Sequence, residues 1–161
     1  MFISTSILLD MLKIICIGKK HEDIYLGSIA HFESRLKPFV KFEWRLLPHS
    51  SLDGDHARKE ESERILNSTS ADEYVILLDE TGSPLSSPDI ASSFEKAQNS
   101  SRDILMIIGG AYGVDDSVKN RADQTLSFGK VVFPHQLMRV MVLEQCYRAY
   151  SILAGSKYHH E

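Results

Sequence analysis

Short apolar runs alternate along this chain with segments whose apolar residues recur at helical spacing. The runs that predict buried strands are residues 12–18, 40–47, 74–78 and 104–108. The segments that predict helices are 22–35, 55–66, a helix that starts at 86–89, 116–121 and 135–153. Strands that alternate with helices predict an α/β domain with a mostly parallel sheet and helices on both faces.

Local composition adds three finer expectations. Residues 79–84 contain glycine and proline and predict a turn that closes the third strand. The segment 55–66 is charged and its apolar face is thin, so we expect an exposed helix there. The pieces 126–128 and 131–133 are short and apolar, which predicts two brief strands before the last helix.

The last predicted helix is apolar on nearly every side. Its apolar residues are Leu137, Met138, Val140, Met141, Val142, Leu143, Cys146, Tyr147, Ala149, Tyr150, Ile152 and Leu153. Such a helix is buried all round, which in a small domain favours a second subunit packed against it. The alternative is that the domain's own sheet and helices cover it.

Three charged residues interrupt this apolar helix. Glu144 and Arg148 are four positions apart and can pair on one face, whereas Arg139 points to nearly the opposite side. Spacing alone leaves two interpretations open. These charges either form salt bridges at a subunit interface or face a substrate pocket formed across a dimer.

Residues 109–113, Gly-Gly-Ala-Tyr-Gly, directly follow a predicted strand and precede a predicted helix. Open α/β sheets bind their ligands at this edge. The loop matches neither the dinucleotide fingerprint nor a P-loop, and no Lys-Ser/Thr pair follows it, which disfavours a nucleotide-triphosphate site. Its glycines either let the backbone approach a flat ligand closely or form a tight turn.

Composition and charge narrow the classes of partner. The chain has 161 residues, of which 43% are hydrophobic and 25% charged, as in an ordinary globular domain. The formal net charge of −4 argues against general nucleic-acid binding, so an RNA partner would need a local basic patch or a preformed fit. Cys16 and Cys146 lie in apolar runs without paired spacing, which predicts buried thiols of a reducing compartment.

The two ends of the chain carry different signals. Residues 1–10 are apolar but too short to span a membrane and have no basic start, so we expect an upstream extension with Met11 as the working start. The tail, residues 157–161, is either an unstructured terminus or a functional segment. Tyr158 can stack on a base, and a neutral imidazole of His159 can take a proton. We expect no metal site, because no third ligand matches His159 and His160 in spacing.

Several motifs together resemble the ribosomal RNA large-subunit methyltransferase H family, in the SPOUT superfamily of knotted methyltransferases. The motifs are Leu77-Leu78-Asp79, Ile107-Ile108-Gly109-Gly110-Ala111-Tyr112-Gly113, Leu126-Ser127-Phe128, Phe133-Pro134-His135-Gln136-Leu137-Met138-Arg139-Val140, Glu144-Gln145-Cys146-Tyr147-Arg148-Ala149 and Tyr158-His159-His160-Glu161. The resemblance covers residues 11–161, which we expect to form one domain, and leaves residues 1–10 outside.

The resemblance implies a fold, a partner and a reaction. The C-terminal part would form a deep trefoil knot, which general topology rules disfavour. The molecule would be a homodimer without a membrane association. The reaction would transfer a methyl group from S-adenosyl-L-methionine to N3 of a pseudouridine in large-subunit (23S) ribosomal RNA on the assembled ribosome. A cytoplasmic location is expected from the N-terminal segment, which has neither a membrane span nor a small-residue cleavage site.

The resemblance also implies site residues. The cofactor would be held by Leu78, Gly109 and the loop Phe128, Gly129, Lys130, Val131, Val132 and Phe133. His159 would be the proton acceptor or orienter, with Tyr158 and Arg148 placing the base and phosphate. His160 fits this set less well, since relatives can carry another basic residue there.

Three other functions compete with this one. A SPOUT methyltransferase acting on transfer RNA is disfavoured by the Tyr-His-His-Glu ending and by the lack of a separate RNA-binding domain. A non-catalytic α/β module that binds ribosomes is disfavoured by the glycine loop and the tail. A nucleotide-binding α/β protein is disfavoured by the missing phosphate-loop lysine.

Overall fold

A five-stranded parallel sheet runs through the computed structural model, which describes residues 10–160. The strands are β1 (Met11–Ile17), β2 (Lys41–Leu47), β3 (Tyr74–Ser83), β4 (Ile104–Ile108) and β5 (Gln124–Leu126), in the order β2-β1-β4-β3-β5. Each paired strand is parallel to its neighbour, as the alternation of strands and helices predicted. The expected extension over residues 1–10 lies outside the described residues apart from Asp10.

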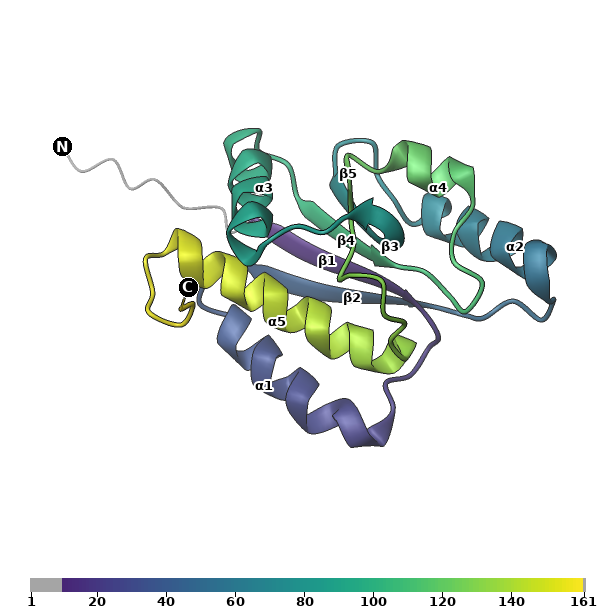
Figure 1. The fold of residues 1–161 in the computed structure, drawn as a ribbon, viewed down its shortest axis with the longest axis horizontal. Coiled ribbons are helices and arrows are strands. Elements are labelled where there is room, and N and C mark those ends of the chain that lie inside the picture. Colours follow the sequence, from purple (N-terminus) through teal and green to yellow (C-terminus); the bar gives the residue numbers. More distant parts are fainter. Residues whose placement is uncertain (1–9, 161) are drawn as a thin grey trace.

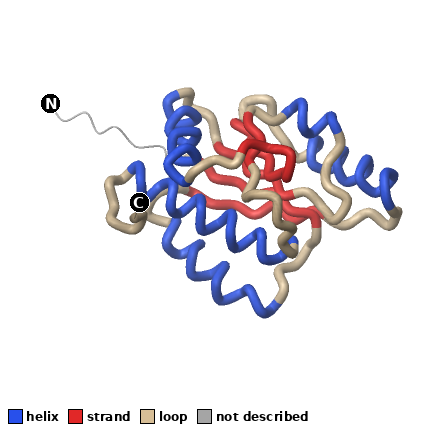
Figure 2. The backbone as a smooth tube through the Cα atoms, in the orientation of Figure 1, coloured by secondary structure: helices blue, strands red, loops and turns tan. Residues whose placement is uncertain are grey.

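Helices cover both faces of this sheet (Figure 1). The helices are η1 (Asp23–Tyr25), α1 (Leu26–Leu36), α2 (Gly54–Asn67), α3 (Ser87–Asn99), α4 (Asp116–Arg121) and α5 (His135–Leu153). Helices α1, α3 and α5 pack together on one face, and α2 and α4 lie on the other. Figure 2 shows the strands as a central layer between the two groups of helices. The predicted α/β architecture with helices on both faces is therefore confirmed.

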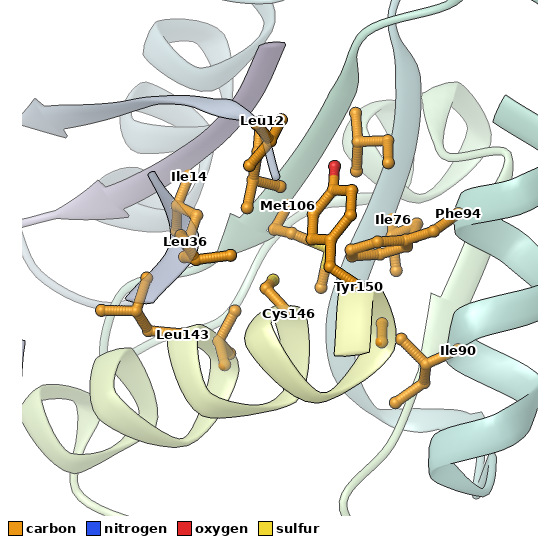
Figure 3. Close-up of a cluster of buried hydrophobic side chains, with 14 of the residues drawn as sticks. Leu12, Ile14, Leu36, Ile76, Ile90, Phe94, Met106, Leu143, Cys146 and Tyr150 are labelled. Carbon is orange, nitrogen blue, oxygen red and sulfur yellow. The ribbon is translucent and has the colours of Figure 1, made fainter. Parts of the chain in front are cut away.

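The larger core lies between α5 and the sheet (Figure 3). Leu143, Cys146 and Tyr150 of α5 are buried against Leu12 and Met106 of the sheet. Full burial of a leucine-sized side chain stabilises the fold by roughly 1.5–3 kcal/mol, so this helix anchors the domain. The sheet, α1 and α3 cover α5 on three sides.

One strip of α5 is only partly covered by its own chain. Leu137, Val140 and Met141 are only half-buried there. Burial on all sides, which the apolar pattern predicted, is therefore reached only in part by the single chain.

Two of the predicted loops and strands differ from the structure. Strand β3 continues to Ser83, because after an irregularity beyond Leu78 the chain returns to pair Ser83 with Leu126 of β5. The predicted strand at 131–133 is absent, and these residues form a loop with Val131 and Val132 exposed. Local apolarity predicted a strand there, but no neighbouring strand offers hydrogen bonds to it.

The expected exposure of helix 55–66 is also wrong. Ala57, Glu61, Ser62 and Ile65 of α2 are buried. Two of these residues are polar, so a count of apolar residues alone made the buried face look thin.

Both cysteines are buried free thiols, as predicted. Burial raises the pKa of the Cys16 thiol to about 12 and raises that of Cys146 as well. Among residues 10–160, no helix combines the length and the apolarity needed to cross a membrane.

Candidate active site

A cleft of about 450 Å³ opens at the carboxyl ends of β3, β4 and β5. The chain reaches it three times, with residues 78–81 at the irregularity of β3, residues 108–114 at the end of β4, and residues 126–129 and 131–133 at the end of β5. Parallel strands bring their carboxyl ends to one edge of the sheet, which is where open α/β sheets bind ligands. The first residues of α5 close the cleft on one side.

Backbone forms one wall of this cleft at the glycine loop. A β-carbon at Gly109 would lie 3.0 Å from Val114 Cγ1 and 3.4 Å from the carbonyl carbon of Gly113. A β-carbon at Gly110 would collide with the Glu61 carboxylate of α2. Side chains at these two positions would therefore collide with the protein's own atoms, and the Gly113 N–H donates to the Gly110 carbonyl oxygen at 3.0 Å, so the glycines serve a tight, closely packed turn.

The predicted cofactor residues lie around this cleft with one exception. Leu78, Gly109, Phe128, Gly129, Val131, Val132 and Phe133 line it, whereas Lys130 is exposed and does not. Gly129 adopts a φ of 103°, which favours glycine, and its N–H donates to Ser127 Oγ at 3.0 Å. The structure brings these residues together, and their binding of a cofactor stays a prediction.

Charged groups that sequence reasoning missed also reach the cleft. Arg58, Asp79, Glu80, Lys119 and His135 line it. Arg58 belongs to α2, which the sequence had marked as an exposed helix. Ala57, Glu61 and Ile65 are spaced four positions apart and therefore lie on one face of the helix, where all three are buried. This spacing was the signal in the sequence that α2 packs against the rest of the domain.

His135, at the start of α5, has a pKa below its ordinary value. Burial is the main cause, and the charges of Arg139 and His49 add to it, while Glu61 acts in the opposite direction. The imidazole that lines the cleft is therefore held toward its neutral form.

The predicted catalytic residues form a second group around Glu144. Arg148 Nε donates to Glu144 Oε1 at 2.9 Å, and Arg148 Nη2 also contacts that oxygen. The Tyr158 hydroxyl donates to the same carboxylate oxygen at 3.2 Å. Arg148 Nη1 lies 3.2 Å from His159 Nδ1. Arg148, Tyr158 and His159 therefore come together, and Glu144 joins them through the pairing with Arg148 that the helix spacing predicted.

Cations also surround the Tyr158 ring. The guanidinium carbons of Arg148 and Arg35 lie 4.8 Å and 5.6 Å from its centroid. Burial and the neighbouring Glu144 charge raise the pKa of the Tyr158 phenol, which outweighs the lowering by the two arginines. Tyr158 is therefore a hydrogen-bond donor at neutral pH rather than a base.

Arg139 serves the fold rather than either group. It is 1% exposed, and its guanidinium donates to the carbonyl oxygens of Ile17, Gly18 and Lys20 at 2.8–3.1 Å. It also contacts His21 Nδ1 at 3.1 Å. Both interpretations offered for Arg139, an interface salt bridge and a substrate contact, are wrong, because its donors hold the loop that follows β1.

The two groups of predicted site residues lie at opposite ends of α5. Met138 lines the cleft, and Arg148 is ten positions further on, which is roughly 15 Å along a helix. Figure 1 shows the last described residues, 154–160, beside the far end of α5. One chain therefore does not bring the tail to its own cleft.

A mostly apolar groove borders the cleft. It shares Ser127, Phe128 and Gly129 with the cleft and runs past Val140 and Met141 to Glu144 and Gln145. Its remaining lining comes from Phe32 and residues 84–90. This groove contains the half-buried strip of α5.

Comparison with known proteins identifies the family. The family model described as "Predicted SPOUT methyltransferase" matches residues 11–159. The chain is 34% identical to ribosomal RNA large subunit methyltransferase H of Christiangramia forsetii, over 92% of this chain and 98% of that protein. It is 37% identical to the protein of the same name from Lactobacillus delbrueckii subsp. bulgaricus, with the same coverage.

A solved structure supports the fold. A crystal structure of a methylase family protein from Neisseria gonorrhoeae aligns with a TM-score of 0.53 and 15% identity, over 93% of this chain and 86% of that one. The resemblance carried by the sequence motifs is confirmed: the chain belongs to the SPOUT methyltransferase family and, within it, to the ribosomal RNA large subunit methyltransferase H family.

Proposed function

We propose that this enzyme transfers a methyl group from S-adenosyl-L-methionine to N3 of a pseudouridine in large-subunit ribosomal RNA. Family membership supports the methyl donor, the RNA class and the reaction. The observation that carries the proposal is the cleft at the carboxyl ends of β3, β4 and β5, where the segments predicted to hold the cofactor meet.

The cleft fits this cofactor on several counts. Leu78, Leu126 and Phe128 line it and offer apolar contact to an adenine ring. The cofactor is cationic at sulfur, and acidic groups lie near: Asp79 and Glu80 line the cleft, and the buried Oε2 of Glu61 behind Gly110 has no hydrogen-bond partner among the described residues. When bound, the cofactor supplies an electrophilic methyl group on a sulfonium.

The chain's own residues supply positioning. Backbone groups of residues 78–81, 109–113 and 127–133 would hold the cofactor. Arg148, Tyr158 and His159 would hold the target base, with Arg148 and Tyr158 directed by Glu144. Alignment of two reactants accounts for a large part of such a rate enhancement.

We also propose a homodimer and a C-terminal knot. Arg148, which contacts the tail, lies roughly 15 Å along α5 from Met138 of its own cleft, so a partner's tail would complete each site. The apolar groove and the half-buried strip of α5 support a second copy at this place. Membership of the SPOUT family, whose resemblance implied a trefoil knot, supports the knot.

The substrate would be the assembled ribosome in the cytoplasm. A formal net charge of −4 gives little general attraction to RNA, so the ribosome would present a preformed binding surface. We expect weak binding to the naked RNA fragment for the same reason.

Calorimetric titration with S-adenosylmethionine tests the cofactor site first. We expect saturable binding, followed by methyl transfer to ribosomes from a strain that lacks the modification. Mass spectrometry of the digested RNA would locate the methyl group. Absence of cofactor binding together with ribosome binding would replace the proposal with a non-catalytic ribosome-binding role, and transfer to transfer RNA alone would replace the substrate.

A further inference from the structure

The contact between Arg148 and His159 determines which imidazole nitrogen carries the proton. Arg148 Nη1 lies 3.2 Å from His159 Nδ1. A guanidinium has only donors, so Nδ1 must accept with its lone pair. In the neutral ring the proton is then on Nε2. The free edge of His159 therefore presents an N–H group and not a lone pair.

A chain of hydrogen bonds holds Arg148 in the orientation that produces this contact. Glu144 Oε1 accepts from Arg148 Nε at 2.9 Å, which leaves Nη1 directed to the imidazole. Glu144 Oε2 accepts from Gln145 Nε2 at 2.7 Å, and Gln145 Oε1 accepts from Ser87 Oγ of α3 at 2.7 Å. The Glu144 and Arg148 side chains are only 19% and 24% exposed, so little water competes for these bonds.

We propose that His159 acts on the target base as a neutral Nε2–H donor and not as the proton acceptor. Glu144 is the positioning residue, because it orients Arg148, which donates to His159 Nδ1 and so keeps the proton on Nε2. This inference rests on the proposed function and assigns a role that the tail motif alone left open. Loss of the N3 proton spreads negative charge onto the two carbonyl oxygens that flank N3. A donor placed at one of them stabilises that charge where it develops.

The reaction then balances without a histidine base. Pseudouridine N3 gives its proton to water and forms a bond to the methyl carbon. The bond from that carbon to sulfur breaks, and its electron pair stays on sulfur to leave a neutral thioether. A proton taken up at His159 Nδ1 would instead break the hydrogen bond from Arg148, so the arrangement opposes that role.

The same relationship occurs once more in the fold. Arg139 Nη1 lies 3.1 Å from His21 Nδ1, and because a guanidinium has only donors, His21 Nδ1 is the acceptor. Burial and the Arg139 charge lower the pKa of His21, which keeps that ring neutral. His21 therefore provides an internal reference for a ring whose Nδ1 accepts from arginine.

Long-range proton–nitrogen NMR of histidine-labelled protein tests the tautomer directly. We expect the Nε2–H form at His159 and His21, and a mixture at exposed His160. Arg148→Met should convert His159 to a mixture and leave His21 unchanged. The Nδ1–H form at His159 in the wild-type protein would overturn the inference. Because this readout needs neither cofactor nor ribosome, it is independent of whether the proposed function holds.

Two variants of His159 separate a donor from a base. A glutamine amide can present an N–H near the Nε2 position but cannot take a proton. We expect His159→Ala to lower methyl transfer about 100-fold, as loss of one such donor does, and His159→Gln to recover most of that loss. Equal losses of about 100-fold or more in both variants would mark His159 as the base and overturn the inference.

Variants of Glu144 and a cofactor titration complete the test. The charged groups facing His159 and Tyr158 are Arg148, Glu144 and Arg35. Glu144→Gln should lower kcat and convert His159 to a mixture of tautomers, while the affinity for S-adenosylmethionine stays constant. Glu144→Asp should recover part of kcat. A normal tautomer and kcat in Glu144→Gln would remove Glu144 from this role.

Discussion

A carboxylate oxygen of Glu61 occupies the space that a β-carbon at position 110 would need, so that α2 and the glycine loop are packed without a gap. Glu61 is 4% exposed, and its other oxygen accepts from the Ser50 N–H at 3.0 Å. The carboxylate therefore ties the loop after β2 to the wall of the cleft. Gly110 is required here for space and not for a special backbone angle.

Gly110→Ala should lower the free energy of unfolding by about 1–3 kcal/mol, the usual cost of overpacking, and should weaken S-adenosylmethionine binding by distorting the cleft wall. Calorimetry measures the affinity. Combining it with Glu61→Ala should recover part of the loss, because the collision is removed. Gly27→Ala on α1 is the matched control: a β-carbon there meets nothing within 4 Å, and cofactor affinity should not change. Full affinity in Gly110→Ala would show that Glu61 moves away freely.

Arg139→Met should lower the free energy of unfolding by at least about 2 kcal/mol, because buried carbonyl groups after β1 lose their donors. Urea denaturation measures this quantity. Arg148→Met on the same helix is the comparison, since its partly exposed ion pair should contribute less than about 1 kcal/mol. Similar losses in the two variants would contradict the distinction between a structural and a site arginine.

The stability of the fold should decrease as the pH falls through about 6.5, the ordinary pKa of histidine. His21 and His135 have lowered pKa values in the folded state, so below 6.5 the unfolded chain binds more protons and is favoured. Urea denaturation at about pH 7.5 and about pH 5.5, one value on each side of that pKa, measures the difference in the free energy of unfolding.

A double change, His21→Gln with His135→Gln, should reduce this pH dependence. His31→Gln, at an exposed position of α1, controls for the loss of a histidine. An unchanged dependence in the double variant would assign the effect to other groups.

Neither cysteine should react with a thiol reagent in the native protein. Cys16 and Cys146 are buried, and burial raises both thiol pKa values, so little thiolate is present at neutral pH. Spectrophotometric titration should find both thiols only after denaturation. Ser51→Cys, at an exposed position, should react at once and serves as the positive control. Rapid native reaction at Cys146 would mean that α5 opens from the sheet.

Much of the fold followed from local pattern. The strands at 11–17 and 104–108 and the helix at 135–153 lie within a residue of their predicted bounds, because each is a buried apolar run or a long periodic segment. The capping box of Ser86 and Asp89 at the start of α3 agrees with the helix start predicted there. Residues 131–133 were predicted wrongly, because an apolar run becomes a strand only where a partner strand exists.

The sequence by itself determined the alternation of elements, the buried cysteines and, through its motifs, the family. The tertiary structure alone decided how the polar residues are used. Arg139 and Arg148 are similar in sequence context, yet one holds backbone carbonyls in the core and the other directs His159. The two glutamates are also used differently: Glu61 packs against Gly110, and Glu144 accepts a hydrogen bond from Arg148. Hydrogen bonds and buried charges depend on distances of a few ångströms between elements, and spacing along one helix cannot supply those distances.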